Sequence, residues 1–435
     1  MKVILLLFLL ISVSGVIAVI PEPTNIKWAT NQYALIQSNL LISYTNRPRC
    51  TTVTSALQRF GASLDKYHQV KGKDVVTNTT ANLLSVYIAA FCDEVFSKQY
   101  PNQNMNEACE CMNVYIPLVQ IDDYPRFKHR GFLIDSSRHF LSVPVIKRFV
   151  DAMSMVKMNV LHWHIVDDQS FPYDSYTFPG MASMGAFQRF GKIYTQQDVA
   201  EVIEYARQRG VRVMSEFDTP GHTLSWGNSI TGLLTKCYTG SELNGNFGPI
   251  DPTNEKNYNF IKSFFDEVKT VFPDDYIHLG GDEVPFNCWA SNPDVKVFMQ
   301  HMNITSYADL ESYYIERLGK IVAQLKPTAV KVFWEEVFFN KAMASTDDVV
   351  HVWIDERNLM DKISQITSQK YRVLISAPWY LNYISYGDDW TKYYSFEPLN
   401  FNGTPEQKAR ILGGEACMWG EYVGDTNLIS RSWSV

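Results

Sequence analysis

The sequence lacks the short motifs that mark several common enzyme classes. It contains no HExxH or CxxC spacing for a metal, no GxGxxG or phosphate-binding loop for a nucleotide, and no GxSxG for a serine nucleophile. These absences argue against a structural metal site, a dinucleotide cofactor and serine-hydrolase chemistry. We therefore expect a protein that works with its own side chains, with no metal and no cofactor.

The sequence also has little charge of one sign and no second long apolar run. After the N-terminus no stretch reaches about 18 apolar residues, the length that crosses a membrane. The 39 Lys and Arg against 46 Asp and Glu give a formal net charge of −7. This balance argues against a general nucleic-acid binder. We expect no membrane span and no nucleic-acid partner.

The first residues have the pattern of a secretory signal peptide. Lys2 precedes the apolar run VILLLFLLISV, and small residues up to Ala18 suit cleavage there, so 1–18 is predicted to be removed. A mature chain on the secretory route would reach the lysosome or the extracellular space. Three sequons fit this route and predict N-glycosylation at Asn78, Asn303 and Asn402.

Seven cysteines on an oxidising route predict disulfides, with at least one cysteine left over. Cys237 and Cys288 lie in segments expected to flank the same pocket, and they form the first predicted pair. Cys50 and Cys92 form the second. Cys417 lies in an apolar strand, which favours a buried free thiol.

From about residue 130, short apolar runs alternate with amphipathic stretches of helical spacing, such as 195–210. The eight candidate strands are 130–138, 158–168, 211–218, 276–283, 330–336, 348–355, 371–381 and 411–421. Eight strand-then-helix units predict an α/β fold, a (β/α)8 TIM barrel over 125–435, with a doubly wound open sheet as the runner-up. Residues 19–124 do not alternate and predict a small α+β domain.

Every predicted strand ends at, or is closely followed by, a polar or aromatic residue. These are Arg138, Asp167, Asp218, His222, Asp282, Glu283, Trp334, Trp353, Tyr380, Trp419 and Glu421. Catalytic residues of such barrels come from the carboxyl ends of several strands. A cup lined by carboxylates and aromatic rings fits a carbohydrate. The two adjacent acids Asp282 and Glu283, after two glycines, suggest glycosidic cleavage.

Four blocks, HWHIVDD, FDTPGHT, HLGGDEV and GGEACMWGE, carry a resemblance to a known family. In this order they resemble the β-N-acetylhexosaminidases of glycoside hydrolase family 20, of the eukaryotic lysosomal or secreted type. The resemblance runs from about Arg126 to the last residue. It implies removal of terminal, non-reducing β-linked GlcNAc or GalNAc from an oligosaccharide or glycoconjugate. It also implies a retaining mechanism in which the substrate's own acetamido oxygen is the nucleophile.

The resemblance assigns the catalytic roles. Glu283 would be the general acid and then the base, while Asp282 would orient the acetamido group and stabilise its developing charge. Tyr380 would bond the acetamido oxygen. Asp167 and His222 would form a relay that tunes the proton affinity of Glu283.

The resemblance also assigns the sugar contacts. The residues that would enclose the sugar or bind its hydroxyls are Trp334, Trp353, Trp419, Arg138, Glu421 and Asn382. For His162 and His164, lining the pocket and packing inside the barrel are left as equal alternatives. Relatives of this type imply a possible homodimer.

Two differences from the family pattern bear on activity and stability. The residue after Asn382 is Tyr383, where relatives that accept sulfated sugars carry Arg, so neutral sugars are expected and sulfated ones are in doubt. After Glu421 only YVGDTNLISRSWSV remains, which is too short for a loop and an average helix of about 11–12 residues. We therefore expect a truncated barrel that lacks its last helix and is marginally stable. The alternative function is a catalytically impaired sugar-binding isoform.

Overall fold

The computed structural model describes residues 25–35, 115–122, 124–187, 191–355, 357–385, 387 and 389–433. The chain divides into two compact units. The first comprises Met1–Arg126 with Ser154–Lys157 and Gln208–Gly210, and the second comprises the rest of the chain. Asn78, Cys50 and Cys92 lie outside the described residues, and the predictions for them stay predictions.

In the first unit, the described elements are two antiparallel strands. Strand β1 (Asn25–Leu35) pairs with β2 (Tyr115–Asp122), from Asn25 opposite Asp122 to Leu35 opposite Tyr115, with one irregularity between Trp28 and Tyr33. This hairpin-like pair joins the two ends of the segment predicted as an α+β domain. The α+β fold of that domain stays a prediction.

The second unit is built on a closed barrel of eight parallel strands. In chain order they are β3 (His129–Asp135), β4 (Val160–His164), β5 (Arg212–Glu216), β8 (Tyr276–His278), β9 (Val330–Trp334), β10 (Val349–Val352), β11 (Arg372–Ile375) and β12 (Ile411–Met418). The barrel prediction is confirmed, because β12 pairs with β3 and leaves no open edge. Most strands are shorter than predicted, because their last residues leave the ladder to form the loops.

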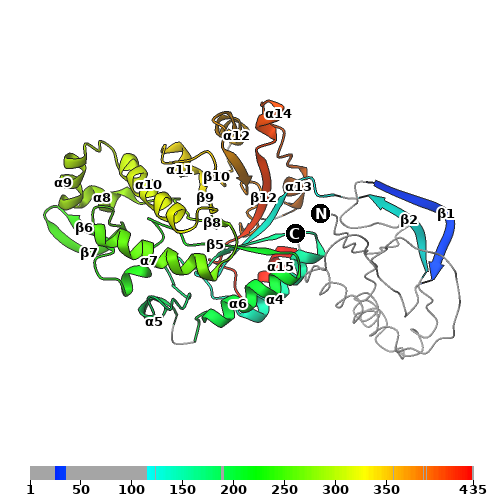
Figure 1. Ribbon diagram of the computed structural model, residues 1–435, viewed down its shortest axis with the longest axis horizontal. Coiled ribbons are helices and arrows are strands. Elements are labelled where there is room, and N and C mark those ends of the chain that lie inside the picture. The colour runs from blue at the N-terminus through cyan, green and yellow to red at the C-terminus, as the bar shows by residue number, and fades with distance from the viewer. Residues whose placement is uncertain are drawn as a thin grey trace. The chain divides into compact units, whose positions relative to one another are not determined.

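Helices cover the outside of the barrel (Figure 1). The longer ones are α4 (Val143–Met155), α6 (Gln196–Gln208), α7 (Glu255–Val271), α9 (Pro293–Met302), α10 (Tyr307–Leu325) and α12 (Leu359–Ser368). The shorter ones are α5 (Gly180–Gly185), α8 (Phe286–Ser291), α11 (Glu335–Phe339), α13 (Trp390–Ser395), α14 (Pro405–Lys408) and the 3-10 helix Trp226–Asn228. Each long helix buries one apolar face: in α7 this face includes Phe260, Ile261 and Phe264. That amphipathic spacing is what the sequence pattern indicated.

The sequence predicts that the chain after the last strand is too short for a full last helix, and the structure shows a short helix there. A six-residue helix, α15 (Leu428–Trp433), follows β12. Its start is fixed by the Asn427 side chain, which accepts a hydrogen bond from the Gly424 amide at 2.8 Å. Leu428 is fully buried, and the Trp433 ring lies 5.9 Å from the Phe149 ring. Leu428 belongs to the apolar core, and Ile429 and Trp433 pack against it, so this helix is docked although it is only about half the length of an average helix.

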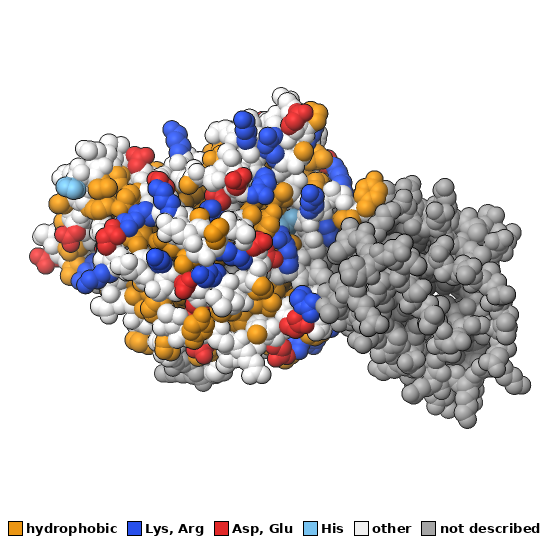
Figure 2. All heavy atoms as spheres, viewed as in Figure 1, with side chains coloured by type: hydrophobic (Ala, Val, Ile, Leu, Met, Phe, Trp, Pro, Cys, Tyr) orange, Lys and Arg blue, Asp and Glu red, His pale blue; other side chains and the backbone are white. Residues whose placement is uncertain are grey.

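Figure 2 shows acidic and basic side chains interspersed over the visible face of the barrel unit. Asn303 and Asn402 are both exposed, so an enzyme that attaches glycans could reach them, and their glycosylation stays a prediction. In the described part of the chain, no helix combines the length and the apolar character that a membrane crossing requires.

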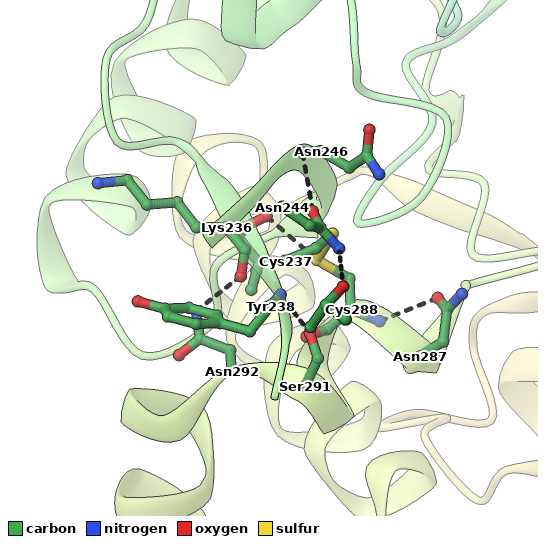
Figure 3. The surroundings of a disulfide bond; sticks show 11 residues. Lys236, Cys237, Tyr238, Asn244, Asn246, Asn287, Cys288, Ser291 and Asn292 are labelled. Atoms are coloured by element: carbon green, nitrogen blue, oxygen red, sulfur yellow. Dashed lines mark hydrogen bonds between the residues drawn. A yellow bond between two sulfur atoms is a disulfide. The ribbon is translucent and has the colours of Figure 1, made fainter. Parts of the chain in front are cut away.

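The predicted disulfide between Cys237 and Cys288 is present. It joins β6 (Leu234–Thr239), which forms a hairpin with β7 (Glu242–Ile250), to helix α8. Figure 3 shows two hydrogen bonds beside it, from the Tyr238 amide to the Ser291 hydroxyl and from the Asn292 side chain to the Lys236 carbonyl, both 2.9 Å. The bridge therefore holds in place the helix that begins three residues after Glu283. Cys417 is a buried free thiol, as predicted.

We expect the double substitution Cys237→Ser with Cys288→Ser to lower the free energy of unfolding by about 2–4 kcal/mol, because the bridge closes a loop of 51 residues in the unfolded chain. Denaturant unfolding followed by tryptophan fluorescence measures the change. The variant and the wild type share all other cysteines, so the difference between their unfolding free energies reports on this bridge alone. A variant that unfolds together with the wild type would contradict the prediction.

Candidate active site

The residues predicted to form the site lie in the loops at one end of the barrel. Because all eight strands are parallel, their carboxyl ends form a single rim. Each predicted residue follows a strand or ends it: Arg138 follows β3, Asp167 follows β4, His222 follows β5, Asp282 and Glu283 follow β8, Trp334 ends β9, Trp353 follows β10, Tyr380 and Asn382 follow β11, and Trp419 and Glu421 follow β12.

The two glycines before the paired acids make the strand end abruptly. Gly280 and Gly281 have φ values of 71° and 94°, and a Cβ on either would overlap a neighbouring side chain. The Gly281 amide donates to Oδ1 of Asp218 at 2.8 Å. This irregular backbone lets the two adjacent acids occupy different surroundings. The side chain of Asp282 is 11% exposed, whereas that of Glu283 is 61% exposed.

The Asp167 carboxylate is the centre of a buried charged cluster. Its Oδ2 lies 2.9 Å from the Arg138 guanidinium and 2.7 Å from Nε2 of His164, and its Oδ1 lies 3.1 Å from Nδ1 of His222. Burial alone would raise the pKa of Asp167, but the hydrogen bonds and charges of the two histidines outweigh it and lower that pKa. Asp167 is therefore ionised and holds the His222 ring in one orientation.

His222 connects this cluster to the paired acids. Its Nε2 lies 3.7 Å from Asp282 and 3.8 Å from Glu283, and has no hydrogen-bond partner among the described residues. Burial alone would lower the pKa of His222, but the nearby carboxylates, Asp282 first, hold that pKa well above its usual range. A protonated ring with a free N–H thus faces both acids.

Asp218 lies beneath the paired acids and is completely buried. Burial, together with the charge of Asp282, raises the pKa of Asp218 well above its usual range. Asp218 is therefore held protonated, and its side chain hydrogen-bonds that of Asp282. A carboxylate can accept several hydrogen bonds, so Asp282 can also accept one from a ligand N–H or O–H.

Four aromatic side chains gather beside the acids. Trp334 and Tyr380 are buried, and the half-buried rings of Trp353 and Trp419 pack against them. The Tyr380 ring is stacked at 5.8 Å from Trp353, and the ring of Trp419 lies 6.1 Å from Trp334. These rings come from four different strand ends, and closure of the barrel brings them together as the strand-end pattern predicted. They form an apolar wall suited to a sugar ring or a methyl group.

Arg138 connects the aromatic wall to the Asp167 cluster. Its guanidinium lies 5.2 Å over the Trp419 ring and 3.0 Å from Asp135, a buried residue at the end of β3 that sequence reasoning missed. Asp135 also accepts from the Gly420 amide at 2.9 Å, which ties the loop after β12 to β3. Arg138 is thus oriented by two carboxylates rather than left free at the surface.

Asn382 and Glu421 are placed at the outer part of the site. Glu421 is exposed, and its charge contributes to raising the pKa of Arg138. The Asn382 side-chain oxygen is buried and unpaired among the described residues, while its carbonyl accepts from Arg431 at 3.2 Å. Both residues therefore lie near the cup, and among the described residues neither makes a hydrogen bond to the paired acids.

Glu336 is a second residue that the sequence did not indicate. It follows β9 in α11 and accepts a hydrogen bond from the Trp353 indole at 3.0 Å. Burial, reinforced by the charge of Asp282, raises the pKa of Glu336 to about 8. An acid in a short helix after a strand resembles an ordinary solvated N-terminal turn, so no local signal could have found it.

The barrel interior beneath the site holds further paired charges. His162, for which lining the pocket was one alternative, is completely buried between Glu415 at 2.8 Å and Glu216 at 3.0 Å. Groups of three ligand-type side chains lie close together here, and His162 belongs to two of them. Each ring nitrogen of His162 lies beside a carboxylate. Ion pairs between histidines and carboxylates therefore explain why these side chains lie close together. His164 is likewise buried, and it contacts Asp167 as described above.

The sequence matches a known enzyme family over more than two thirds of its length. The family model described as glycosyl hydrolase family 20, catalytic domain, matches residues 127–434. The chain is 53% identical to the rat protein named beta-hexosaminidase subunit alpha, over 73% of this chain and 60% of that protein. It is 41% identical to the human protein named beta-hexosaminidase subunit beta, over 95% of this chain and 80% of that protein.

A solved structure is similar as well. The chitobiase of Flavobacterium johnsoniae aligns with a TM-score of 0.75 at 26% identity, over 94% of this chain and 66% of that chain. The chain spans about 60% of the length of the alpha subunits that it matches.

Replacement of Asp167 by Asn should lower the pKa of His222, because a negative charge 3.1 Å from Nδ1 favours the protonated ring. The ring-proton signal of His222, followed by NMR against pH, measures the shift. Asp168→Asn is the matched control: the charge of Asp168 also acts on His222, but its carboxylate accepts from the Leu224 amide at 2.9 Å and not from the ring, so a smaller shift is expected. Equal shifts in both variants would contradict the prediction, because Asp167 would then stabilise the protonated His222 ring no more than Asp168 does.

Proposed function

Because the chain belongs to glycosyl hydrolase family 20, we propose that it removes terminal, non-reducing β-linked N-acetylhexosamine residues from glycoconjugates. The sugar would be GlcNAc or GalNAc, and its own acetamido oxygen would act as the nucleophile. The observation that carries this proposal is the placement of Asp282 and Glu283. One acid is mostly buried beside Asp218, the other is open to solvent, and a protonated histidine faces both.

In the first step, the acetamido oxygen attacks the anomeric carbon as the bond to the leaving oxygen breaks. Glu283 gives its proton to that leaving oxygen. Asp282 accepts a hydrogen bond from the acetamido N–H and stabilises the positive charge that develops on the cyclised group. The neighbouring side chains suit this division, since an acid open to solvent can meet the departing sugar while a buried one holds the substrate.

In the second step, Glu283 removes a proton from water, whose oxygen attacks the anomeric carbon. The bond to the acetamido oxygen breaks, and the sugar leaves with the configuration it had at the start. His222, oriented by Asp167 at 3.1 Å, lies near enough to Glu283 to influence both proton transfers. No protein nucleophile is needed, which places this scheme among the exceptions to the two-carboxylate mechanism.

The remaining residues of the cup bind the sugar in this proposal. The Tyr380 hydroxyl donates a hydrogen bond to the acetamido oxygen. Trp334, Trp353 and Trp419 enclose the acetamido methyl and the sugar face, which accounts for four apolar rings beside a charged centre. Arg138, Glu421 and Asn382 bind the outer hydroxyls.

Substrate choice, partner and route belong to the same proposal. Tyr383, exposed next to Asn382, offers no positive charge for a sulfate, so we propose neutral sugars as substrates. The secretory route to the lysosome or the cell exterior is supported by the leader pattern at 1–18 and by the exposed sequons at Asn303 and Asn402. A homodimer remains a prediction from the resemblance.

Substrate assistance predicts dependence on the acetamido group. We expect a chromogenic 2-acetamido glycoside to be hydrolysed and its 2-hydroxy counterpart to be hydrolysed far more slowly, because only the first carries its own nucleophile. A thiazoline analogue of the cyclised intermediate should compete with substrate. Equal rates on the two glycosides would overturn the mechanism, and absence of turnover on both would favour the sugar-binding alternative.

The paired acids should differ in how their loss depends on the leaving group. Glu283→Gln should lower kcat by about 10²–10⁴-fold on substrates whose leaving oxygen needs a proton, and much less on activated aryl glycosides. Asp282→Asn should impair both kinds of substrate, because orientation and charge stabilisation are lost. Steady-state kinetics with the two leaving groups tests this, and an identical pattern in the two variants would contradict the assignment.

A further inference from the structure

Glu216 is a completely buried carboxylate at the end of β5, beneath the cup. Its Oε2 accepts a hydrogen bond from Nδ1 of His164 at 2.6 Å, and its Oε1 accepts one from the Trp334 indole at 2.8 Å. His162 and His278, from β4 and β8, each place a ring nitrogen 3.0 Å from the same carboxylate. One side chain thus contacts residues of three other strands.

We propose that Glu216 is a positioning residue that fixes both the acid–base relay and the aromatic wall of the sugar cup. The effect of this role on catalysis rests on the proposed function. Glu216 does not reach the substrate. It acts through His164 on one side and through Trp334 on the other.

The relay side is a continuous path of short contacts. It runs from Glu216 to His164 at 2.6 Å, from His164 to Asp167 at 2.7 Å, and from Asp167 to His222 at 3.1 Å. The free Nε2 of His222 then faces Glu283 at 3.8 Å. Because His164 bonds a carboxylate through each ring nitrogen, its ring can neither flip nor turn without breaking a buried ionic hydrogen bond.

The charges along this path alternate in sign. Burial alone would raise the pKa of Glu216, but the surrounding histidines, His278, His164 and His162, hold that pKa well below its usual range. Burial alone would lower the pKa of His164. The charge of Glu216 and the hydrogen bonds of His164 to Asp167 and Glu216 instead hold that pKa well above its usual range. Glu216 is therefore ionised and His164 protonated, so His164 donates to both of its partners.

The wall side concerns Trp334. Its ring lies 6.3 Å from Trp353 and 6.1 Å from Trp419, and it is the most deeply buried of the three tryptophans. The indole N–H has one partner in the described structure, the Glu216 carboxylate. Loss of that acceptor would leave a buried donor unpaired and release the ring that the other two tryptophans pack against.

Glu415 offers a matched control. It is a buried carboxylate of the same interior network, bonded to His129 at 2.5 Å and to His162 at 2.8 Å. Among the described residues it makes no hydrogen bond to His164 or Trp334, and it is joined to Glu216 through His162, which contacts both carboxylates. Glu415→Gln therefore removes a comparable buried charge without cutting the path or freeing the wall.

The test compares Glu216→Gln, His164→Gln and Glu415→Gln with the wild type on two 2-acetamido glycosides, one with an alkyl and one with an activated aryl leaving group. For Glu216→Gln we expect kcat on the alkyl glycoside to fall about 10-fold or more, a part of the effect of general acid catalysis. We expect a much smaller fall on the aryl glycoside, together with a raised KM on both. His164→Gln should reproduce the leaving-group effect with little change in KM. Glu415→Gln should change both substrates by the same small factor.

The His222 ring signal in NMR provides a readout that does not need turnover. We expect its titration to shift in Glu216→Gln and in His164→Gln, but not in Glu415→Gln. If Glu216→Gln and Glu415→Gln behave alike in kinetics and in this titration, the inference is wrong while the proposed function stands. If the wild type cleaves neither glycoside, the proposed function fails, and an unshifted His222 signal in Glu216→Gln would then overturn the positioning role as well.

Discussion

The pairing of β12 with β3 is the constraint on which the rest of the structure depends. Residues from Gly413 to Met418 pair in register with His129 to Ile134, which turns eight parallel strands into a closed ring. A Cβ at Gly413, whose φ is 142°, would overlap the His129 carbonyl, so this close approach requires glycine. Only closure brings the loop after the last strand beside the loop after the first. The contact of Arg138 with Trp419 and that of Asp135 with the Gly420 amide both follow from it.

Inside the barrel, buried negative and positive side chains alternate along the path to the site. Carboxylates and histidines follow one another from the barrel interior to the rim, so that each buried charge faces one of opposite sign. Isolated ions would be far too costly to bury, whereas paired ones with short hydrogen bonds are tolerated. Such pairs add little net stability compared with apolar packing, but they constrain ring orientations closely. The interior network is therefore better understood as a support for the site than as a source of stability.

At the rim, two adjacent acids acquire different surroundings from one irregular turn. Glycines at 280 and 281 end β8, after which Asp282 turns inward toward Asp218 and Glu283 turns outward. Pairs of carboxyls in unlike environments are the common means by which one site obtains two chemical roles. The disulfide at Cys288 holds the helix that follows these acids, and so restrains the turn from its other end.

The sequence by itself determined the barrel, the order of its strands and the identity of most rim residues, because strand ends and motif blocks are local features. It also indicated the Cys237–Cys288 bridge. Only the tertiary structure decided the roles open to Asp135, Glu216 and Glu336, and the docking of α15. The physical reason is that these residues act through partners far away in the chain: the Trp334 indole reaches Glu216 across 118 residues, and His162 reaches Glu415 across 253. In sequence, each such acid is indistinguishable from a charge at the end of a strand or at the start of a helix, and burial among histidines is known only once the ring has closed.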